Sequence, residues 1–166
     1  MAKIQEISIN LWFDTQAEAA AKYYTSIFKK SSIDSMSYYT EAGKEIHKMK
    51  PDSILTVEFT LGKQKFVGLN GGPVFKFNEA VSIVVNCETQ DDVDYYWEKL
   101  KKGGDPKARQ CGWLKDKYGV SWQVVPVILA KMMTDKNKTK VENVMAVMMQ
   151  MKKLDIKKLE KAFNKK

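Results

Sequence analysis

The sequence predicts an α+β fold made of paired βαβββ modules, followed by C-terminal helices. Two observations carry this prediction: one order of strand and helix patterns occurs twice along the chain, and the pattern becomes wholly helical after Pro126. A third is size, because 166 residues with 44% hydrophobic content can bury a substantial core.

The first module begins with a strand and a helix. Apolar and polar residues alternate over residues 7–13, the period of a strand with one buried face. Apolar residues at helical spacing then predict a helix over residues 16–28, which Thr15 and Glu18 would start as a capping box. Three short strands are expected next, at 32–40, 54–61 and 65–70, separated by a loop at 41–52 and a turn at 62–63.

The second module repeats this order. Residues 81–87 alternate as a strand, and Thr89 caps a helix that ends at Gly103-Gly104. Strands are expected at 113–115 and 120–125, with Pro126 ending the last. A further strand near 105–110 is needed to complete the count, although its β propensity is poor.

Registration of the two halves supports a duplication. A shift of 74 residues places the first strand on residues 81–87, Ser8 on Ser82, and Thr15 on Thr89. The helices then align after a slip of one residue. Because the pattern and the helix starts agree, two copies of one supersecondary unit explain the sequence best.

Beyond Pro126 the sequence predicts three helical segments. One apolar run covers residues 127–133, a second stripe covers 141–148, and Asp155 would cap a third segment. The methionines of this region suit adaptable core or interface packing. We therefore expect a first module at 1–72, a second at 73–126 and a C-terminal helical extension at 127–166, together forming one compact unit.

The positive charge is concentrated at one end of the chain. From Lys131 onward there are eleven lysines and four acidic residues, so this segment carries +7 of the formal +8. Arg109 is the one arginine, and no basic stripe alternates with aromatic residues. We expect a solvated helical surface and no nucleic-acid partner.

The compartment follows from the N-terminal residues and the cysteines. The first residues lack the apolar stretch of a signal peptide, and no window reaches the roughly 20 apolar residues that span a bilayer. Cys87 and Cys111 are expected to be reduced thiols. The sequence thus predicts a cytoplasmic protein with no membrane partner.

Several ordered motifs resemble one family. They are LWFD at 11–14, LNGGP at 69–73 and CGWLKDKYGVSWQ at 111–123. The chain, from about residue 4 to 163 and including the closing helices, resembles the PhnB-like branch of the glyoxalase/bleomycin resistance (vicinal oxygen chelate) superfamily. Members of this branch are often labelled 3-demethylubiquinone-9 3-methyltransferase domains.

The resemblance implies curved sheets that form a cavity, commonly in a homodimer. In metal-dependent relatives, His or Gln, Glu, His and Glu on the first, fourth, fifth and eighth strands bind a divalent cation. Here those positions fall near Ser8, on either Gly68 or Asn70, on Ser82 and on Gln123. Neutral hydroxyls and amides are weak transition-metal ligands, so we expect no metal and no other cofactor.

The predicted site residues are side chains that could line this cavity. The candidates are Ser8, Asn10, Asn70, Ser82, Trp122 and Gln123. Trp12 shares strand parity with Ser8, whereas Trp122 is opposite in parity to Gln123. The sequence alone therefore does not allow the two tryptophans to be assigned to the cavity together.

Catalytic residues are less well marked. Cys111 is a weak candidate for a reactive thiol, and the alternative is a small packed residue at the start of a strand. Asp116 is expected to be a turn residue, and His47 a solvated residue in a loop.

Three functions are consistent with these residues. The first is a metal-free protein that binds a small molecule in the cavity. The second is an enzyme of this superfamily, a lyase or the labelled methyltransferase, with an atypical site. However, neither Gly71-Gly72 nor Gly103-Gly104 lies between a buried strand and a helix, as the usual methyl-donor fold requires. The third is a dimeric interaction protein with a vestigial cavity.

Overall fold

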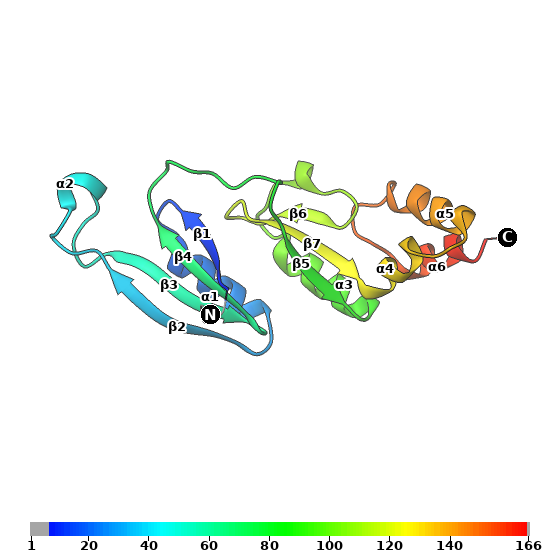
Figure 1. Ribbon diagram of the computed structural model, residues 1–166, viewed down its shortest axis with the longest axis horizontal. Helices are drawn as coiled ribbons and strands as arrows, with labels where there is room; N and C mark the ends of the chain where they lie inside the picture. The colour runs from blue at the N-terminus through cyan, green and yellow to red at the C-terminus, as the bar shows by residue number, and fades with distance from the viewer. Residues whose placement is uncertain (1–6, 166) are drawn as a thin grey trace, which may run out of the picture. The chain divides into compact units, whose positions relative to one another are not determined.

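The computed structural model describes residues 7–165 and confirms the predicted α+β class. The chain divides into two compact units between Lys76 and Phe77, and each unit is described by itself. Each contains one sheet and the helix that packs on it (Figure 1).

The first unit contains a four-stranded sheet in the order β1-β4-β3-β2. Its elements are β1 (Ile9–Phe13), α1 (Ala17–Ile27), β2 (Ser31–Tyr38), α2 (Lys44–His47), β3 (Ile54–Leu61) and β4 (Gln64–Asn70). Strand β1 pairs parallel with β4, and β4 pairs antiparallel with β3. The predicted loop at 41–52 contains the short helix α2.

Helix α1 covers one face of this sheet. It buries one apolar stripe, made of Ala17, Ala20, Ala21, Tyr24 and Ile27. The buried residues of the strands include Leu11, Phe13, Val57, Phe59 and Phe66. A Cβ built on Gly68 would lie 3.1 Å from the Cβ of Ala17, so the helix approaches the backbone of β4 closely. The opposite face, here called the first open face, carries exposed or half-buried side chains.

The second unit contains a three-stranded sheet in the order β5-β7-β6. Its elements up to that point are β5 (Ile83–Cys87), α3 (Gln90–Leu100), a 3₁₀ turn (Pro106–Ala108), β6 (Trp113–Lys115) and β7 (Ser121–Pro126). Helix α3 buries Val93, Trp97 and Leu100, and the sheet buries Val85, Trp122 and Val124.

The duplication is visible in these elements. Strand β5 begins 74 residues after β1, both have five residues, and each pairs parallel with the last strand of its own module. Helices α1 and α3 both have eleven residues.

One expected strand is not formed. Residues 105–110 hold the 3₁₀ turn, in which the Asp105 side chain accepts a hydrogen bond from the Lys107 N–H at 2.8 Å. Pro106 lacks the N–H that a sheet ladder needs, and only an isolated bridge joins Gln110 to Trp113. Over the described part of the chain, the second sheet therefore has three strands.

The predicted capping box of α1 is also wrong. Gln16 occupies the N-cap and makes no side-chain capping bond. Instead, the Ala17 N–H donates to Asn70 Oδ1 at 2.8 Å, so an amide from the end of β4 caps the helix.

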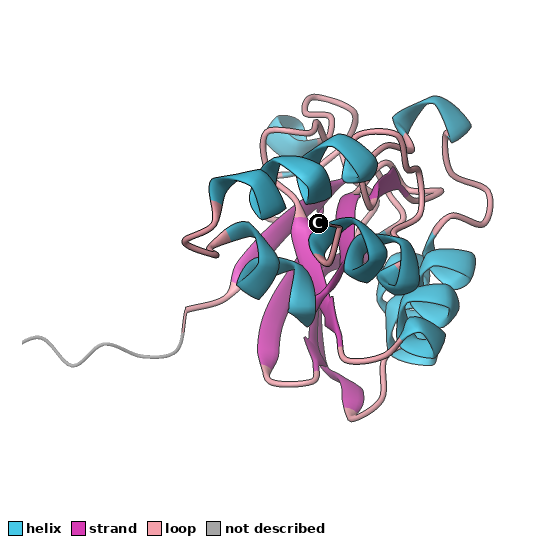
Figure 2. Ribbon diagram, turned by 90° about the vertical axis from the view of Figure 1, so that its right-hand side faces the viewer, coloured by secondary structure: helices cyan, strands magenta, loops and turns pink. Residues whose placement is uncertain are grey.

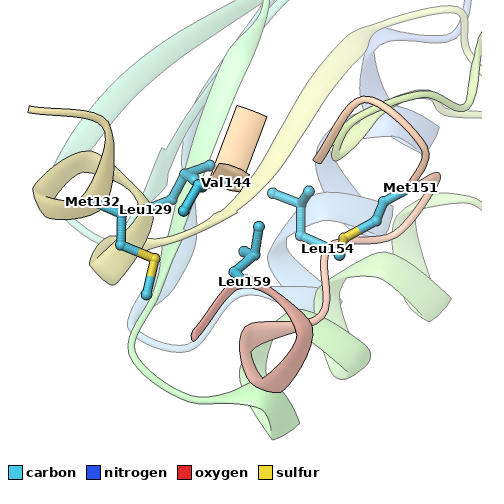
Figure 3. Packing of buried hydrophobic residues seen from close by; sticks show 6 residues of the cluster. All are labelled: Leu129, Met132, Val144, Met151, Leu154 and Leu159. Carbon is cyan, nitrogen blue, oxygen red and sulfur yellow. The ribbon is translucent and has the colours of Figure 1, made fainter. Parts of the chain in front are cut away.

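Three helices close the chain: α4 (Val127–Met133), α5 (Lys138–Met148) and α6 (Ile156–Phe163). Figure 2 shows helices in cyan and strands in magenta. The core of these three helices is a cluster of Leu129, Met132, Val144, Met151, Leu154 and Leu159 (Figure 3). The Asp155 side chain caps α6 by accepting from the Lys158 N–H, as predicted. No helix within residues 7–165 is long and apolar enough to cross a membrane.

Candidate functional site

The first open face presents three rows of side chains, fixed by the strand register. One row is Lys65, Thr60 and Ser32; the next is Asn10, Val67, Glu58 and Ser35; the third is Trp12, Leu69, Thr56 and Ser37. Rows two residues apart are about 7 Å from one another. One end of the face therefore carries charged and hydroxyl side chains. At the other end, β1 and β4 contribute aromatic and apolar side chains.

A groove of about 720 Å³ lies at the charged end of this face. Its lining residues are Ser8, Asp34, Glu58, Phe59, Thr60, Lys65, Phe66 and Val67. The Asp34 carboxylate accepts hydrogen bonds from Ser32 Oγ at 2.6 Å and from Thr60 Oγ1 at 2.7 Å. These two bonds, with a smaller contribution from the Lys65 charge, lower the pKa of Asp34. Asp34 thus supplies a fixed negative charge.

Trp12 is held in place at the aromatic end. Its Nε1–H donates to the Gly72 carbonyl at 2.9 Å, and its ring meets Phe75 edge to face at 4.9 Å. A Cβ on Gly71 would lie 2.2 Å from the indole, so only glycine leaves room for this ring. The half-buried indole therefore forms a rigid wall of the first open face.

Both glycine pairs serve packing. Gly71-Gly72 makes room for Trp12 and accepts its hydrogen bond. A Cβ on Gly104 would lie 1.9 Å from the Lys115 carbonyl oxygen, so this glycine allows two backbone segments to approach. Neither pair is placed as a nucleotide-binding turn between a strand and a helix.

The second sheet also has an open face, opposite α3. Gln123 Nε2 donates to Ser82 Oγ at 2.8 Å there, so two predicted site residues meet. The neighbouring Val84 and Asn86 are both exposed and alternate with buried Val85, so they share one face of β5. Val84 pairs with Gln123 in the register and shares this face.

Of the other predicted cavity residues, two lie on the first open face. Ser8 lines the groove, and Asn10 is exposed in the middle row. Asp34, Glu58 and Lys65 were not predicted. Lys65 and Glu58 have the strand parity opposite to buried Phe66 and Phe59, and this alternation was the available signal.

Asn70 does not lie on the first open face. It is buried on the helix side, where Oδ1 caps α1 and Nδ2 donates to the Ile54 carbonyl at 3.0 Å. Its own carbonyl accepts from the Tyr39 hydroxyl at 2.6 Å. Gly68 faces the helix too, so neither of the two residues considered for the fourth-strand ligand position lies on the first open face. The positions of β4 on the open face are Val67 and Leu69.

Trp122 does not lie on an open face either. Only 1% of the residue is exposed, because it packs on the helix side of the second sheet. Its Nε1–H donates to Asp116 Oδ2 at 2.8 Å. Asp116 Oδ1 accepts from the N–H groups of Tyr118 and Val120, which makes Asp116 a turn residue as predicted.

The donor set does not fit the metal of metal-dependent relatives. Ser8, Val67 or Leu69, Ser82 and Gln123 offer hydroxyl, aliphatic and amide groups where relatives have imidazole and carboxylate. Among the residues that the structure describes, no three His, Cys, Asp or Glu side chains gather as a metal site. His47 packs on the Tyr39 ring at 4.6 Å, and its Nδ1 accepts from the Met49 N–H.

Cys111 lies in a turn before β6. Its backbone has φ +50°, and its N–H donates to the Met151 carbonyl at 2.8 Å. Its Sγ–H points to the Met148 carbonyl at 3.5 Å and to Met149 Sδ at 3.8 Å. The single histidine belongs to the other unit, so within its own unit Cys111 has no imidazole to activate it.

Comparisons with known proteins agree with this architecture. A family described as 3-demethylubiquinone-9 3-methyltransferase matches residues 5–125. A PhnB protein from Bacillus cereus, described with the same methyltransferase name, is 36% identical; the match covers 74% of this chain and 100% of that chain, with a TM-score of 0.62. Protein PA1353 from Pseudomonas aeruginosa is 16% identical over 74% of this chain and 98% of its own, with a TM-score of 0.57, which supports the fold alone.

No curated protein matches the chain. The family match ends at residue 125, so the resemblance of the closing helices to the family stays a prediction. The matched residues include both βαβ units and more than half of the sequence. The chain therefore belongs to the family described as 3-demethylubiquinone-9 3-methyltransferase, and it is similar to a PhnB protein.

Proposed function

We propose that the protein binds a small organic molecule on the first open face without using a metal. The observation that carries this proposal is the groove of about 720 Å³, at the charged end of a face that becomes aromatic at its other end. Small-molecule sites typically have volumes of about 300–1,000 Å³ and combine apolar walls with a few placed polar groups.

The rows of the first open face define the class of ligand. Lys65 and Glu58 offer a donor and an acceptor for a polar group, with Asp34 fixed beside them by its hydroxyl partners. Val67, Leu69 and Trp12 would contact an apolar or planar body. A ligand with a polar head and an aromatic or apolar body, roughly 14 Å long or less, matches two row spacings.

Binding is favoured over catalysis by the chemistry of the donors. The positions where metal-dependent relatives carry ligands offer no imidazole or carboxylate, so no Lewis-acid role is assigned to them. The family description names a methyltransferase, but both glycine pairs are accounted for by packing. We therefore assign no reaction to this site.

A thermal-shift screen with small aromatic acids and amines tests the proposal. A ligand that binds only the folded state must raise the melting temperature. Val67→Trp would fill the groove and remove the shift, whereas Val84→Trp on the second sheet would leave it in place. Equal loss in both variants, or no ligand-dependent shift in the parent protein, would count against binding on the first open face.

Metal content provides a separate test. Protein purified without chelator should contain no stoichiometric Zn, Mn, Ni or Fe. A stoichiometric transition metal whose content fell in Gln123→Ala or Ser82→Ala would overturn the metal-free part of the proposal. Cys111→Ser should leave every ligand-dependent shift unchanged; loss of the shift would revive the thiol hypothesis.

We also propose that the protein is a cytoplasmic homodimer. Val81, just before the edge strand β5, is 74% exposed, and Val84, on that strand, is 47% exposed. A second copy of the chain would cover these apolar side chains. Both cysteines are unpaired, as is usual in a reducing compartment. Light scattering on the parent and on Val84→Lys tests the dimer, and cell fractionation tests the location.

A further inference from the structure

A second groove, of about 760 Å³, lies on the C-terminal helices α5 and α6. It is lined by Asn143, Ala146, Val147, Lys158, Lys161, Ala162, Asn164 and Lys165. The matched family ends at residue 125, and the Bacillus cereus relative is covered completely by 74% of this chain. This groove therefore belongs to the part of the chain beyond the family match.

The floor of the groove is apolar and made of small side chains. Ala146 and Val147 come from α5, and Ala162 comes from α6. Val147 also packs against the buried cluster of the C-terminal helices, which is shown in Figure 3. The floor is thus supported from beneath by a packed core.

The rim of the groove is positively charged. Lys158, Lys161 and Lys165 are spaced three and four residues apart, so they follow one side of α6 and of the turn after it. Lys158 lies at a long 3.9 Å from Asp155, and both side chains are exposed. Within residues 7–165, no carboxylate forms an ion pair with Lys161. Like charges at this spacing repel each other, and a bound anion would relieve the repulsion.

The size of the groove distinguishes between kinds of occupant. Helix α6 has eight residues, a length of about 12 Å at 1.5 Å per residue. The groove volume of about 760 Å³ lies within the usual range of small-molecule sites. The dimensions therefore favour a small ligand over a partner helix.

We propose that this groove binds a small anionic amphiphile, such as a medium-chain carboxylate. The carboxylate lies among Lys158, Lys161 and Lys165, and the hydrocarbon chain lies on Ala146, Val147 and Ala162. The amides of Asn143 and Asn164 complete the polar rim. This site is separate from the ligand site proposed on the first sheet.

Calorimetric titration with sodium decanoate, kept below micelle-forming concentrations, tests the proposal on the full chain. We expect one decanoate per chain and weaker binding at high salt, because exposed charges are screened. Decanol, which lacks the charge, and decyltrimethylammonium, which reverses it, should each bind at least about tenfold more weakly. Decanol binding as tightly as decanoate would overturn the proposal.

Two sets of variants locate the site. Ala146→Phe fills the groove, and Lys161→Gln with Lys165→Gln removes two charges; each should weaken decanoate binding by about tenfold or more. Lys131→Gln with Lys136→Gln is the matched control, since it removes two charges of the same segment outside the groove. The lysines are exposed, so their variants will fold even if Ala146→Phe does not. Equal weakening by both lysine pairs would overturn the assigned position.

A lipid surface could present the same chemistry, and vesicles separate that source from a free amphiphile. We expect phosphatidylglycerol vesicles to compete poorly with decanoate. Binding to the vesicles without binding of monomeric decanoate would overturn the proposal. Val67→Trp should leave decanoate binding unchanged, so the two proposed sites can fail independently.

Discussion

The two modules share a backbone plan but begin their helices in different ways. In the second module, Thr89 and Asp92 form the capping box of α3. The registered pair in the first module, Thr15 and Glu18, leaves this task to Asn70 at the end of β4. Phe13 pairs with Asn70, whereas its counterpart Cys87 pairs with Pro126, which has no side-chain amide. One residue on the last strand thus decides whether the helix is capped locally or from a distance.

The open faces of the two sheets also carry different side chains. The first carries a groove with Asp34, Glu58 and Lys65, whereas the second carries the hydrogen-bonded pair of Ser82 and Gln123 beside exposed Val84. A repeated backbone therefore does not imply a repeated site. The charged side chains assign the proposed ligand to the first sheet.

The largest expected effect concerns the hairpins. Asp116 organises the β6–β7 turn and is 2% exposed, with three hydrogen-bond donors around it. Asp116→Ala would leave these donors unpaired, at a cost of about 4 kcal/mol in unfolding free energy. The β3–β4 turn depends on Gly62 at φ +63°, where Gly62→Ala should cost only about 1 kcal/mol. Urea unfolding measures the free energy of unfolding of both variants. Similar losses for Asp116→Ala and Gly62→Ala would contradict the expected difference between the two turns.

A smaller effect is expected where the first helix is capped from β4. Asn70→Ala removes the acceptor for Ala17 and the donor for the Ile54 carbonyl, and we expect a loss of about 2 kcal/mol. Thr15→Ala should change stability by less than about 0.5 kcal/mol, because Thr15 makes no cap. A larger loss for Thr15→Ala than for Asn70→Ala would mean that the local box caps α1 in solution.

The local cap of the second module is expected to contribute less. Thr89→Ala removes the acceptor for the Asp92 N–H, which lies 3.1 Å from Thr89 Oγ1 in an exposed turn. The expected cost is about 1 kcal/mol, typical for loss of an N-cap hydroxyl. Thr89→Ser keeps the hydroxyl and serves as the matched control. Urea unfolding of both variants checks whether the hydroxyl itself is responsible.

Local patterns predicted much of the fold. The alternation before Phe13 and Cys87 gave strands that the structure contains, and Asp155 caps α6 as its position indicated. The cap at Thr15 failed because Gln16 is the N-cap and Asn70, 53 positions from Ala17, accepts the hydrogen bond of the Ala17 N–H. The strand near residues 105–110 failed because Pro106 and Asp105 favour a turn. Both failures concern contacts or backbone limits that apolar periodicity does not report.

The site was less predictable than the fold. The family pattern drew attention to Asn70 and Gly68, yet both face α1. Strand parity relative to buried Phe66 would have indicated Val67. The fixed charge of Asp34 depends on hydroxyls of two strands, and this required the register of β2 against β3.

The smallest expected effects come from one carboxylate in each unit. The pKa of Asp94 is lowered by Lys153 at 2.6 Å and by Gln90, as that of Asp34 is lowered by Ser32 and Thr60. A folded-state pKa below the unfolded value stabilises the protein above the unfolded pKa, near 3.8, and this contribution disappears as the pH falls through the lowered value.

Substitution by asparagine separates the two carboxylates. Asp94→Asn should cost less than about 1 kcal/mol at pH 7, because water screens this half-exposed pair, and the difference from the parent protein should shrink below pH 3.8. Asp34→Asn keeps an acceptor oxygen for one hydroxyl and offers an amide donor to the other, and should cost less still. We expect Asp34→Asn to weaken ligand binding with little effect on the free energy of unfolding. A pH-dependent loss of unfolding free energy larger than that of Asp94→Asn would mean that the Asp34 charge stabilises the first sheet.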